Sequence, residues 1–75
     1  MITREQLKDL NEGDIVEYRR EYWPEHASVQ GPLERWGRDE ALYLISGLFG
    51  VRQADGSPYE HRGTLTVISR AEVAR

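Results

Sequence analysis

The hydrophobic and polar positions near the N-terminus follow the pattern of a helix start. Thr3 and Gln6 have the spacing of a capping box, and Ile2 and Leu7 occupy the positions of a hydrophobic staple around it. This pattern predicts a short helix near Arg4 to Leu10, ended by the Asn-Glu-Gly segment that follows. Because so short a helix is not stable alone, we expect it to dock on the rest of the domain.

Beyond this helix the spacing changes to the period of a strand. From Ile15 onward one set of residues alternates with another, which predicts a strand with one half-buried face. The two sets are Val16, Tyr18, Arg20 and Tyr22, and Ile15, Glu17, Arg19 and Glu21. Pro24 breaks this strand, since it cannot donate a ladder hydrogen bond and restricts the residue before it. A second strand is predicted from Ser28 to Trp36. The pair Gly31-Pro32 in its middle confines it to a sheet edge or marks a bulge.

The stretch from Ala41 to Gln53 is the most apolar part of the chain. Apolar residues occupy both the odd-numbered and the even-numbered positions, so both faces of a strand here would be buried. This predicts one bent strand buried on two sides, with Gly47 and Gly50 permitting the bend. A hairpin that turns at Ser46-Gly47 is the alternative. Further along, a Thr- and Val-rich strand is predicted near Gly63 to Ile68.

The end of the chain repeats the pattern of a helix start. Ser69 and Glu72 have a second capping-box spacing, with Ile68 and Val73 at the staple positions. A final helical turn near Arg70 to Ala74 is therefore predicted.

These elements predict one mainly β domain over residues 1–75. Short strands with a docked N-terminal helix and a C-terminal helical turn are typical of a small, strongly bent antiparallel sheet or an SH3-like barrel. An open α+β sheet with the helix on one face is the alternative.

Two stretches carry a resemblance to a known group of proteins. MITREQLKDLNEGDIVEY, a helix followed by Gly-Asp and a strand, looks like the start of many small SH3-like barrels. Together with GTLTVISRAEV near the C-terminus, it is similar to small uncharacterised proteins encoded by phages of actinobacteria. The resemblance implies a phage gene expressed inside a bacterial host. It implies no catalytic or binding residues.

Charge and composition exclude several classes of function. The chain has 75 residues, a net charge of −3 and no cysteine, so disulfides, thiolate metal sites and a cysteine nucleophile are excluded. Basic and acidic residues are interspersed, which argues against sequence-independent nucleic-acid binding. No apolar run approaches the roughly 20 residues that span a bilayer. We expect a soluble protein that is located in the cytoplasm of the host cell and contacts no membrane.

Histidine and carboxylate pairs are the strongest candidates for catalysis or metal binding. Glu25-His26 and Glu60-His61 could together supply a tetrahedral set of ligands. Adjacent residues on a strand point to opposite faces, however, so Glu60 and His61 could not easily share a metal. No serine lies in a nucleophile elbow, and a cap accounts for Ser69 and a turn for Ser57. We therefore predict no metal, no cofactor and no enzymatic activity.

Aromatic and arginine residues form the most informative set. Trp, Tyr and Arg dominate the energetics of protein interfaces, and these residue types cluster at two predicted strand ends. The predicted protein-binding residues are Arg20, Tyr22, Trp23, Arg35, Trp36 and Arg38. In the alternative reading, each tryptophan folds over the rim of the barrel as a lid on the core.

From this set we predict that the chain binds a protein, and we expect that protein to belong to the host. Aromatic and arginine side chains also stack on single-stranded nucleic acid, so a nucleic-acid-binding accessory domain is the first alternative. A small virion or assembly component is a more distant one. Self-association is left open.

Overall fold

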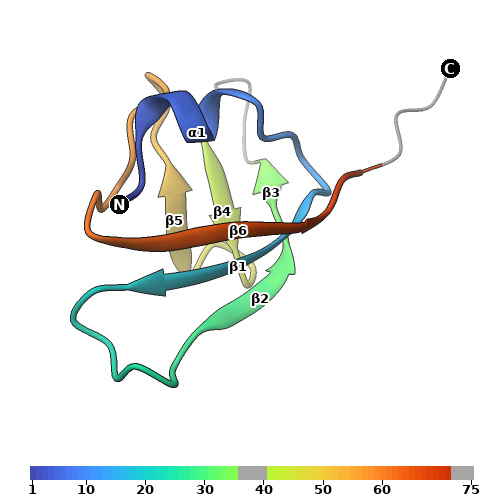
Figure 1. The fold of residues 1–75 in the computed structure, drawn as a ribbon. Coiled ribbons are helices and arrows are strands. Elements are labelled where there is room, and N and C mark those ends of the chain that lie inside the picture. The colour runs from blue at the N-terminus through green and yellow to red at the C-terminus, as the bar shows by residue number, and fades with distance from the viewer. Residues whose placement is uncertain (36–40, 72–75) are drawn as a thin grey trace, which may run out of the picture.

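The computed structural model describes residues 1–35 and 41–71, and this part of the chain is mainly β, as predicted. Its strands form two three-stranded antiparallel sheets, ordered β2-β1-β6 and β3-β4-β5 (Figure 1). The elements are α1 (Arg4–Lys8), β1 (Ile15–Arg20), β2 (Val29–Pro32), β3 (Glu34–Arg35), β4 (Leu42–Leu44), β5 (Phe49–Arg52) and β6 (Gly63–Ser69).

The N-terminal helix begins as the capping pattern predicts. The hydroxyl oxygen of Thr3 accepts a 3.1 Å hydrogen bond from the backbone N–H of Gln6, which satisfies a donor that the helix itself leaves free. Ile2 and Leu7 are buried in the core. The helix ends at Lys8 instead of at the predicted Leu10. Leu10 is still buried, but it lies in the segment that follows the helix.

The N-terminal segment also covers the outer edge of β6. The N–H of Ile2 donates to the carbonyl of His61, and the side-chain amide of Gln6 donates to the carbonyl of Leu65 at 2.7 Å. An edge strand with free backbone groups is a template for pairing with another chain. Here the helix and its flanks occupy part of that edge, which also gives the short helix the docking partner that it needs.

Strand β1 is the centre of the first sheet and alternates as the sequence predicts. Val16 and Tyr18 are buried, whereas Glu17 between them is exposed. Tyr18 pairs with Val29 of β2 on one side and with Leu65 of β6 on the other. This inner face forms one wall of the core.

The predicted strand from Ser28 to Trp36 is not a single strand. The chain runs through β2, leaves the first sheet at Pro32 and enters the second sheet at Glu34. Between them Leu33 is buried, and its N–H and carbonyl bond to Asp14 and Gly13. The Gly-Pro pair therefore marks the point at which the chain changes sheets, because proline cannot continue the ladder.

The prediction of one bent strand over residues 41–53 is wrong, and the alternative hairpin is correct. β4 and β5 pair antiparallel, and the turn between them has positive φ at Ile45, Ser46 and Gly47. The N–H of Ser46 donates to the Glu34 carboxylate at 2.7 Å, which ties the turn to β3. Apolar residues lie on both parities because two strands, rather than one, face the same core.

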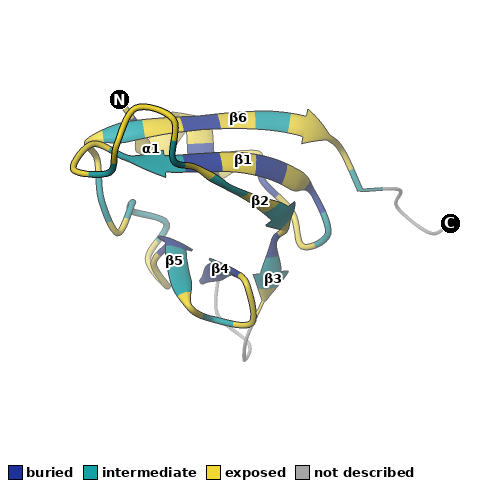
Figure 2. Cartoon of the chain, turned by 90° about the horizontal axis from the view of Figure 1, so that it is seen from below, coloured by how far each residue is buried: buried dark blue, intermediate teal, exposed yellow. Residues whose placement is uncertain are grey.

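The hydrophobic core lies between the two sheets (Figure 2). Among the described residues the sheets stay separate and do not join into one closed barrel. Trp23, Val29, Phe49 and Val67 are partly buried around the core.

The C-terminal segment leaves β6 without forming a helix at Arg70 and Ala71. The rest of the predicted helical turn lies outside the described residues. Within residues 1–35 and 41–71, no helix is long and apolar enough to cross a membrane.

Candidate functional site

A cluster of aromatic side chains covers one end of the core, where β1 leads into the following loop. Trp23 is its centre. The ring of Trp23 packs edge-on against Tyr18, Tyr22 and Phe49, with ring centroids 6.0, 6.2 and 5.2 Å away. Such perpendicular arrangements are favoured between aromatic rings. Phe49 comes from the second sheet, so the cluster joins the two sheets at this end.

Arg20 holds this aromatic cluster together. Its Nε donates to the Tyr18 hydroxyl at 3.0 Å, one terminal nitrogen to the Tyr22 hydroxyl at 3.2 Å, and the other to the carbonyl of Gly50 at 3.1 Å. The guanidinium also lies within 5.7 Å of the centre of the Tyr18 ring and 6.0 Å of that of Phe49, a cation–π arrangement.

These contacts affect the ionisation of Arg20 and Tyr22. Burial works against the charge of Arg20, but hydrogen bonds to Tyr22 and Tyr18 outweigh it and raise the pKa of the guanidinium. The hydrogen bond from Arg20 lowers the pKa of the Tyr22 hydroxyl, since it favours the phenolate.

Arg19 shapes the loop that carries Tyr22 and Trp23. Its Nε donates to the carbonyl of Pro24 at 3.1 Å, and a terminal nitrogen donates to the carbonyl of Trp23. The N–H of Trp23 closes a turn onto the carbonyl of Arg20. Arg19 therefore fixes the backbone of the loop, whereas Arg20 fixes the aromatic rings.

The six predicted binding residues do not lie in one place. Arg20, Tyr22 and Trp23 are together in the aromatic cluster. Arg35 is exposed on β3, in the other sheet and on the opposite side of the molecule from the end of β1 (Figure 1). Trp36 and Arg38 lie outside the described residues.

Exposure separates the members of the cluster. Tyr22 is 68% exposed, whereas Trp23 is only partly exposed and packs on the core. Trp23 thus covers the end of the core as a lid would, and Tyr22 presents its ring to the solvent. Phe49 belongs to the same cluster, although it is not among the predicted binding residues. Its position in an apolar run marks it as core, and only the hairpin brings it to Trp23.

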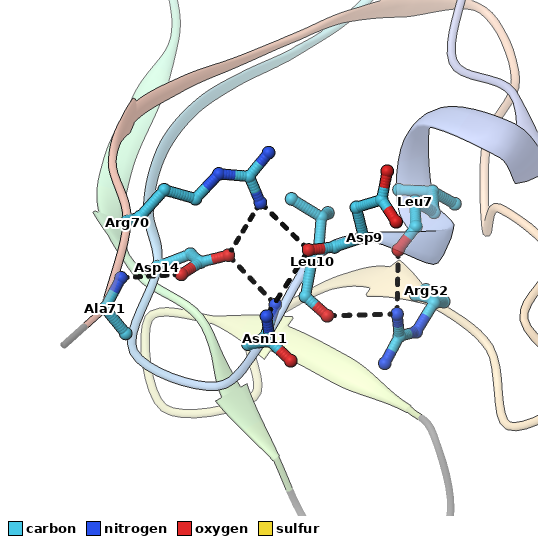
Figure 3. A network of polar contacts seen from close by, with 8 residues as sticks. All are labelled: Leu7, Asp9, Leu10, Asn11, Asp14, Arg52, Arg70 and Ala71. Carbon is cyan, nitrogen blue, oxygen red and sulfur yellow. Dashed lines mark hydrogen bonds and ion pairs between the residues drawn. The ribbon is translucent and has the colours of Figure 1, made fainter. Parts of the chain in front are cut away.

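Two charged residues are buried although no sequence pattern marks them as sites. Asp14 and Arg52 are only 1% and 6% exposed. Oxygens of the Asp14 carboxylate accept hydrogen bonds from the N–H groups of Asn11 and Ala71 and from Arg70, as Figure 3 shows. Buried charges require partners of this kind. Asp14 therefore joins the segment after α1 to the end of β6.

Arg52 is held close to this network but bonds to other groups. One of its terminal nitrogens donates to the carbonyls of Leu7 and Leu10, at 2.7 and 3.3 Å (Figure 3). Leu7 lies in the last turn of α1, and its carbonyl also accepts a hydrogen bond from the N–H of Leu10, which follows the helix. The sequence feature that indicates burial of Arg52 is its place in the apolar run over residues 41–53.

The structure does not bring the histidine–carboxylate pairs into a metal site. In residues 1–35 and 41–71, no three His, Asp or Glu side chains lie close enough together to hold a metal ion. His26 and His61 are both exposed.

Comparisons with known proteins add no functional assignment. No protein-family model, no curated protein and no solved structure significantly matches this chain.

Proposed function

We propose that this chain is a non-enzymatic binding domain that docks a protein through the exposed ring of Tyr22 and the side chains around it. The observation that carries the proposal is that Tyr22 is 68% exposed and yet held in place. Arg20 bonds its hydroxyl, and Trp23 packs edge-on against its ring. An exposed aromatic ring that is fixed before binding loses little conformational entropy in a complex.

The surroundings of Tyr22 support this role. Glu21, Glu60 and Arg62 form with it a shallow groove of about 230 Å³. An exposed aromatic ring beside a polar rim is the usual arrangement at protein interfaces. The binding surface is thus narrower than the set predicted from the sequence, since Arg35 lies elsewhere and Trp23 mainly serves the core.

We also propose that the fold is a partly open, SH3-like barrel, supported by two short antiparallel sheets that face one core. The resemblance to proteins of actinobacterial phages favours a host protein as the partner and the host cytoplasm as its location. Nucleic-acid binding is the competing outcome, and the experiment below distinguishes the two.

The proposal is tested by affinity capture from actinobacterial lysate with the tagged wild type, Tyr22→Ala and Ile68→Ala, followed by binding measurements on the purified captured protein. Ile68 is 49% exposed on β6 and serves as the control. We expect the wild type and Ile68→Ala to bind one protein equally. Tyr22→Ala should weaken this binding by about 2 kcal/mol or more, the scale of an interface hot spot.

Two results would contradict the proposal. One is a captured protein that binds Tyr22→Ala as tightly as the wild type. The other is capture that disappears after nuclease treatment, together with strongly salt-dependent binding of a single-stranded oligonucleotide, which indicates a nucleic-acid ligand.

A further inference from the structure

The hairpin turn between β4 and β5 exposes two large aliphatic side chains (Figure 2). Ile45 and Leu48, at the two ends of the turn, are 46% and 70% exposed. The turn is closed by a hydrogen bond of 3.0 Å from the N–H of Leu48 to the carbonyl of Ile45. Surface turns are usually built from glycine, proline, asparagine, aspartate and serine. Residues 45–48 instead form a small apolar protrusion, which we call the hairpin tip.

The backbone of the hairpin tip is strained at Ile45. Its φ is +52°, in the left-handed region that a β-branched side chain disfavours. Glycine or asparagine adopts this conformation more readily. Because Ile45 stays nearly half exposed, packing within the domain compensates for the strain only in part. Strained residues of this kind cluster at functional sites, so the isoleucine calls for a role outside the fold.

Hydrogen bonds hold the hairpin tip in one shape. Oε2 of Glu34 accepts from the N–H of Ser46 at 2.7 Å, in addition to the hydrogen bond that closes the turn. Phe49, the next residue along the chain, packs on Trp23, which fixes the base of the tip. A segment whose shape is fixed before binding loses little conformational entropy in a complex. The hairpin tip therefore has the properties of a preformed anchor.

We propose that the hairpin tip inserts Ile45 and Leu48 into an apolar pocket of a partner protein. Aliphatic side chains on a protruding turn fit a concave pocket, where they leave the surrounding water. Glu34 adds a requirement for the rim of that pocket. Within residues 1–35 and 41–71 its carboxylate forms no ion pair, so a lysine or arginine of the partner would complement its charge. The proposal stands on this turn and does not require that Tyr22 binds the same partner.

Charge argues against a membrane or a second copy of the chain as the occupant. Residues 41–51 contain no lysine or arginine, so the tip lacks the cations with which peripheral proteins bind anionic lipids. Three grooves on the described surface of the chain each have at least three charged residues in their lining. Seating the tip of a second copy in one of them would take those charges out of water. A different protein is therefore the favoured partner.

The first measurement is thermal denaturation, which needs no partner. Ile45→Asn replaces the strained residue by one that tolerates positive φ and should melt at the temperature of the wild type or higher. Leu48→Ser removes a mostly exposed side chain and should melt within about 4 °C of the wild type. A larger loss in either variant would assign that side chain to the core and overturn the proposal.

The second measurement is capture from actinobacterial lysate, followed by titration of the purified captured protein. The tagged proteins are the wild type, Ile45→Asn, Leu48→Ser and the matched control Ile68→Ser, which removes an exposed aliphatic residue of β6. Wild type and control should bind equally, and both tip variants should bind about tenfold or more weakly. Ile45→Asn should then combine unchanged or raised stability with weaker binding, a combination that loss of structure cannot produce.

Two kinds of result would overturn the role of the hairpin tip. One is that no captured protein binds the tip variants more weakly than the wild type and the control. The other is that the tip variants instead lose binding to vesicles of phosphatidylcholine and phosphatidylglycerol, or lose self-association in sedimentation experiments. Tyr22→Ala in the same titration separates the two proposals. Wild-type affinity of Tyr22→Ala with weak binding of Leu48→Ser contradicts only the role of Tyr22, and the reverse contradicts only the hairpin tip.

Discussion

The backbone N–H of Ala71 donates a 2.7 Å hydrogen bond to the carboxylate of Asp14, a residue 57 positions earlier in the chain. Asp14 also accepts a 2.9 Å hydrogen bond from the N–H of Asn11. One buried side chain therefore organises the turn before β1 and attaches the end of β6 to it.

The first prediction follows from this attachment. Asp14→Ala should lower the free energy of unfolding by about 3 kcal/mol, because it leaves the N–H groups of Asn11 and Ala71 without their acceptor. Glu12→Gln changes an exposed carboxylate in the same turn and should stay within about 0.5 kcal/mol of the wild type. Urea denaturation measures both. Equal stability of the two variants would show that the Asp14 network contributes nothing.

The second prediction concerns pH. Burial raises the pKa of Asp14, but hydrogen bonds from Ala71, Asn11 and Arg70 outweigh burial and place it below the ordinary 3.8. A lowered pKa in the folded state means that the ionised carboxylate stabilises the fold. This stabilisation is complete above the unfolded-state pKa near 3.8 and is lost as the pH falls through the lower folded-state value.

Melting temperatures of the wild type and Asp14→Ala, measured from neutral pH to about pH 2, check this sign. The difference between the two proteins should be constant at neutral and mildly acidic pH and should shrink only below about pH 4. A difference that grows as the pH falls would contradict the assignment.

The third prediction concerns the helix cap. Thr3→Ala should cost about 1 kcal/mol, since it removes the oxygen that accepts from the N–H of Gln6. Thr3→Ser keeps that oxygen and should leave the stability nearly unchanged. Thermal denaturation compares the two, and a similar loss in both variants would assign the effect to packing instead of capping.

The fourth prediction separates Trp23 from Tyr22. Trp23→Ala removes a ring that packs on Tyr18 and Phe49 and should lower the free energy of unfolding by about 3 kcal/mol. Tyr22→Ala removes a mostly exposed ring and should cost no more than about 1 kcal/mol. Denaturation curves of both variants provide the measurement. If Tyr22→Ala unfolds the protein, Tyr22 is a structural residue and the proposed binding surface loses its anchor.

The fifth prediction uses two glycines as a matched pair. A Cβ at Gly63 would lie 2.1 Å from the carbonyl oxygen of Arg19, and its φ of +133° disfavours any other residue. Gly63→Ala should therefore destabilise the pairing of β1 with β6 by about 3 kcal/mol or more. Gly31→Ala adds a methyl group where no atom lies within 4 Å and should be nearly neutral. Comparable melting temperatures for both variants would contradict this close approach.

The sequence by itself determined the local elements. The capping residues located the start of α1, and the two-residue period located β1 with its buried Val16 and Tyr18, although β1 ends at Arg20 and not at Tyr22. Both depend on hydrogen bonds or side-chain directions within a few neighbouring residues, so they are visible in a short stretch of sequence. The mainly β class followed from the same patterns.

The tertiary structure decided how the apolar run over residues 41–53 is used. Both a bent strand and a hairpin account for the apolar residues at odd-numbered and even-numbered positions of this run. The hairpin forms with Ile45 and Ser46 at positive φ and with the N–H of Ser46 bonded to Glu34, 12 residues earlier. Isoleucine and serine have no intrinsic preference for positive φ, so the sequence of the turn does not predict this hairpin.

The candidate sites show the same division. Composition indicated aromatic and arginine residues as candidates for binding. Only the fold shows that Arg20 bonds to both Tyr18 and Tyr22 and that Arg35 lies in the other sheet. Asp14 and Arg52 have the residue types of a solvated surface, and contacts with Ala71 and Leu7, far away in the chain, are what bury and satisfy them. A buried charge is stable only with partners from elsewhere in the fold, so its role cannot be read from its own neighbours in sequence.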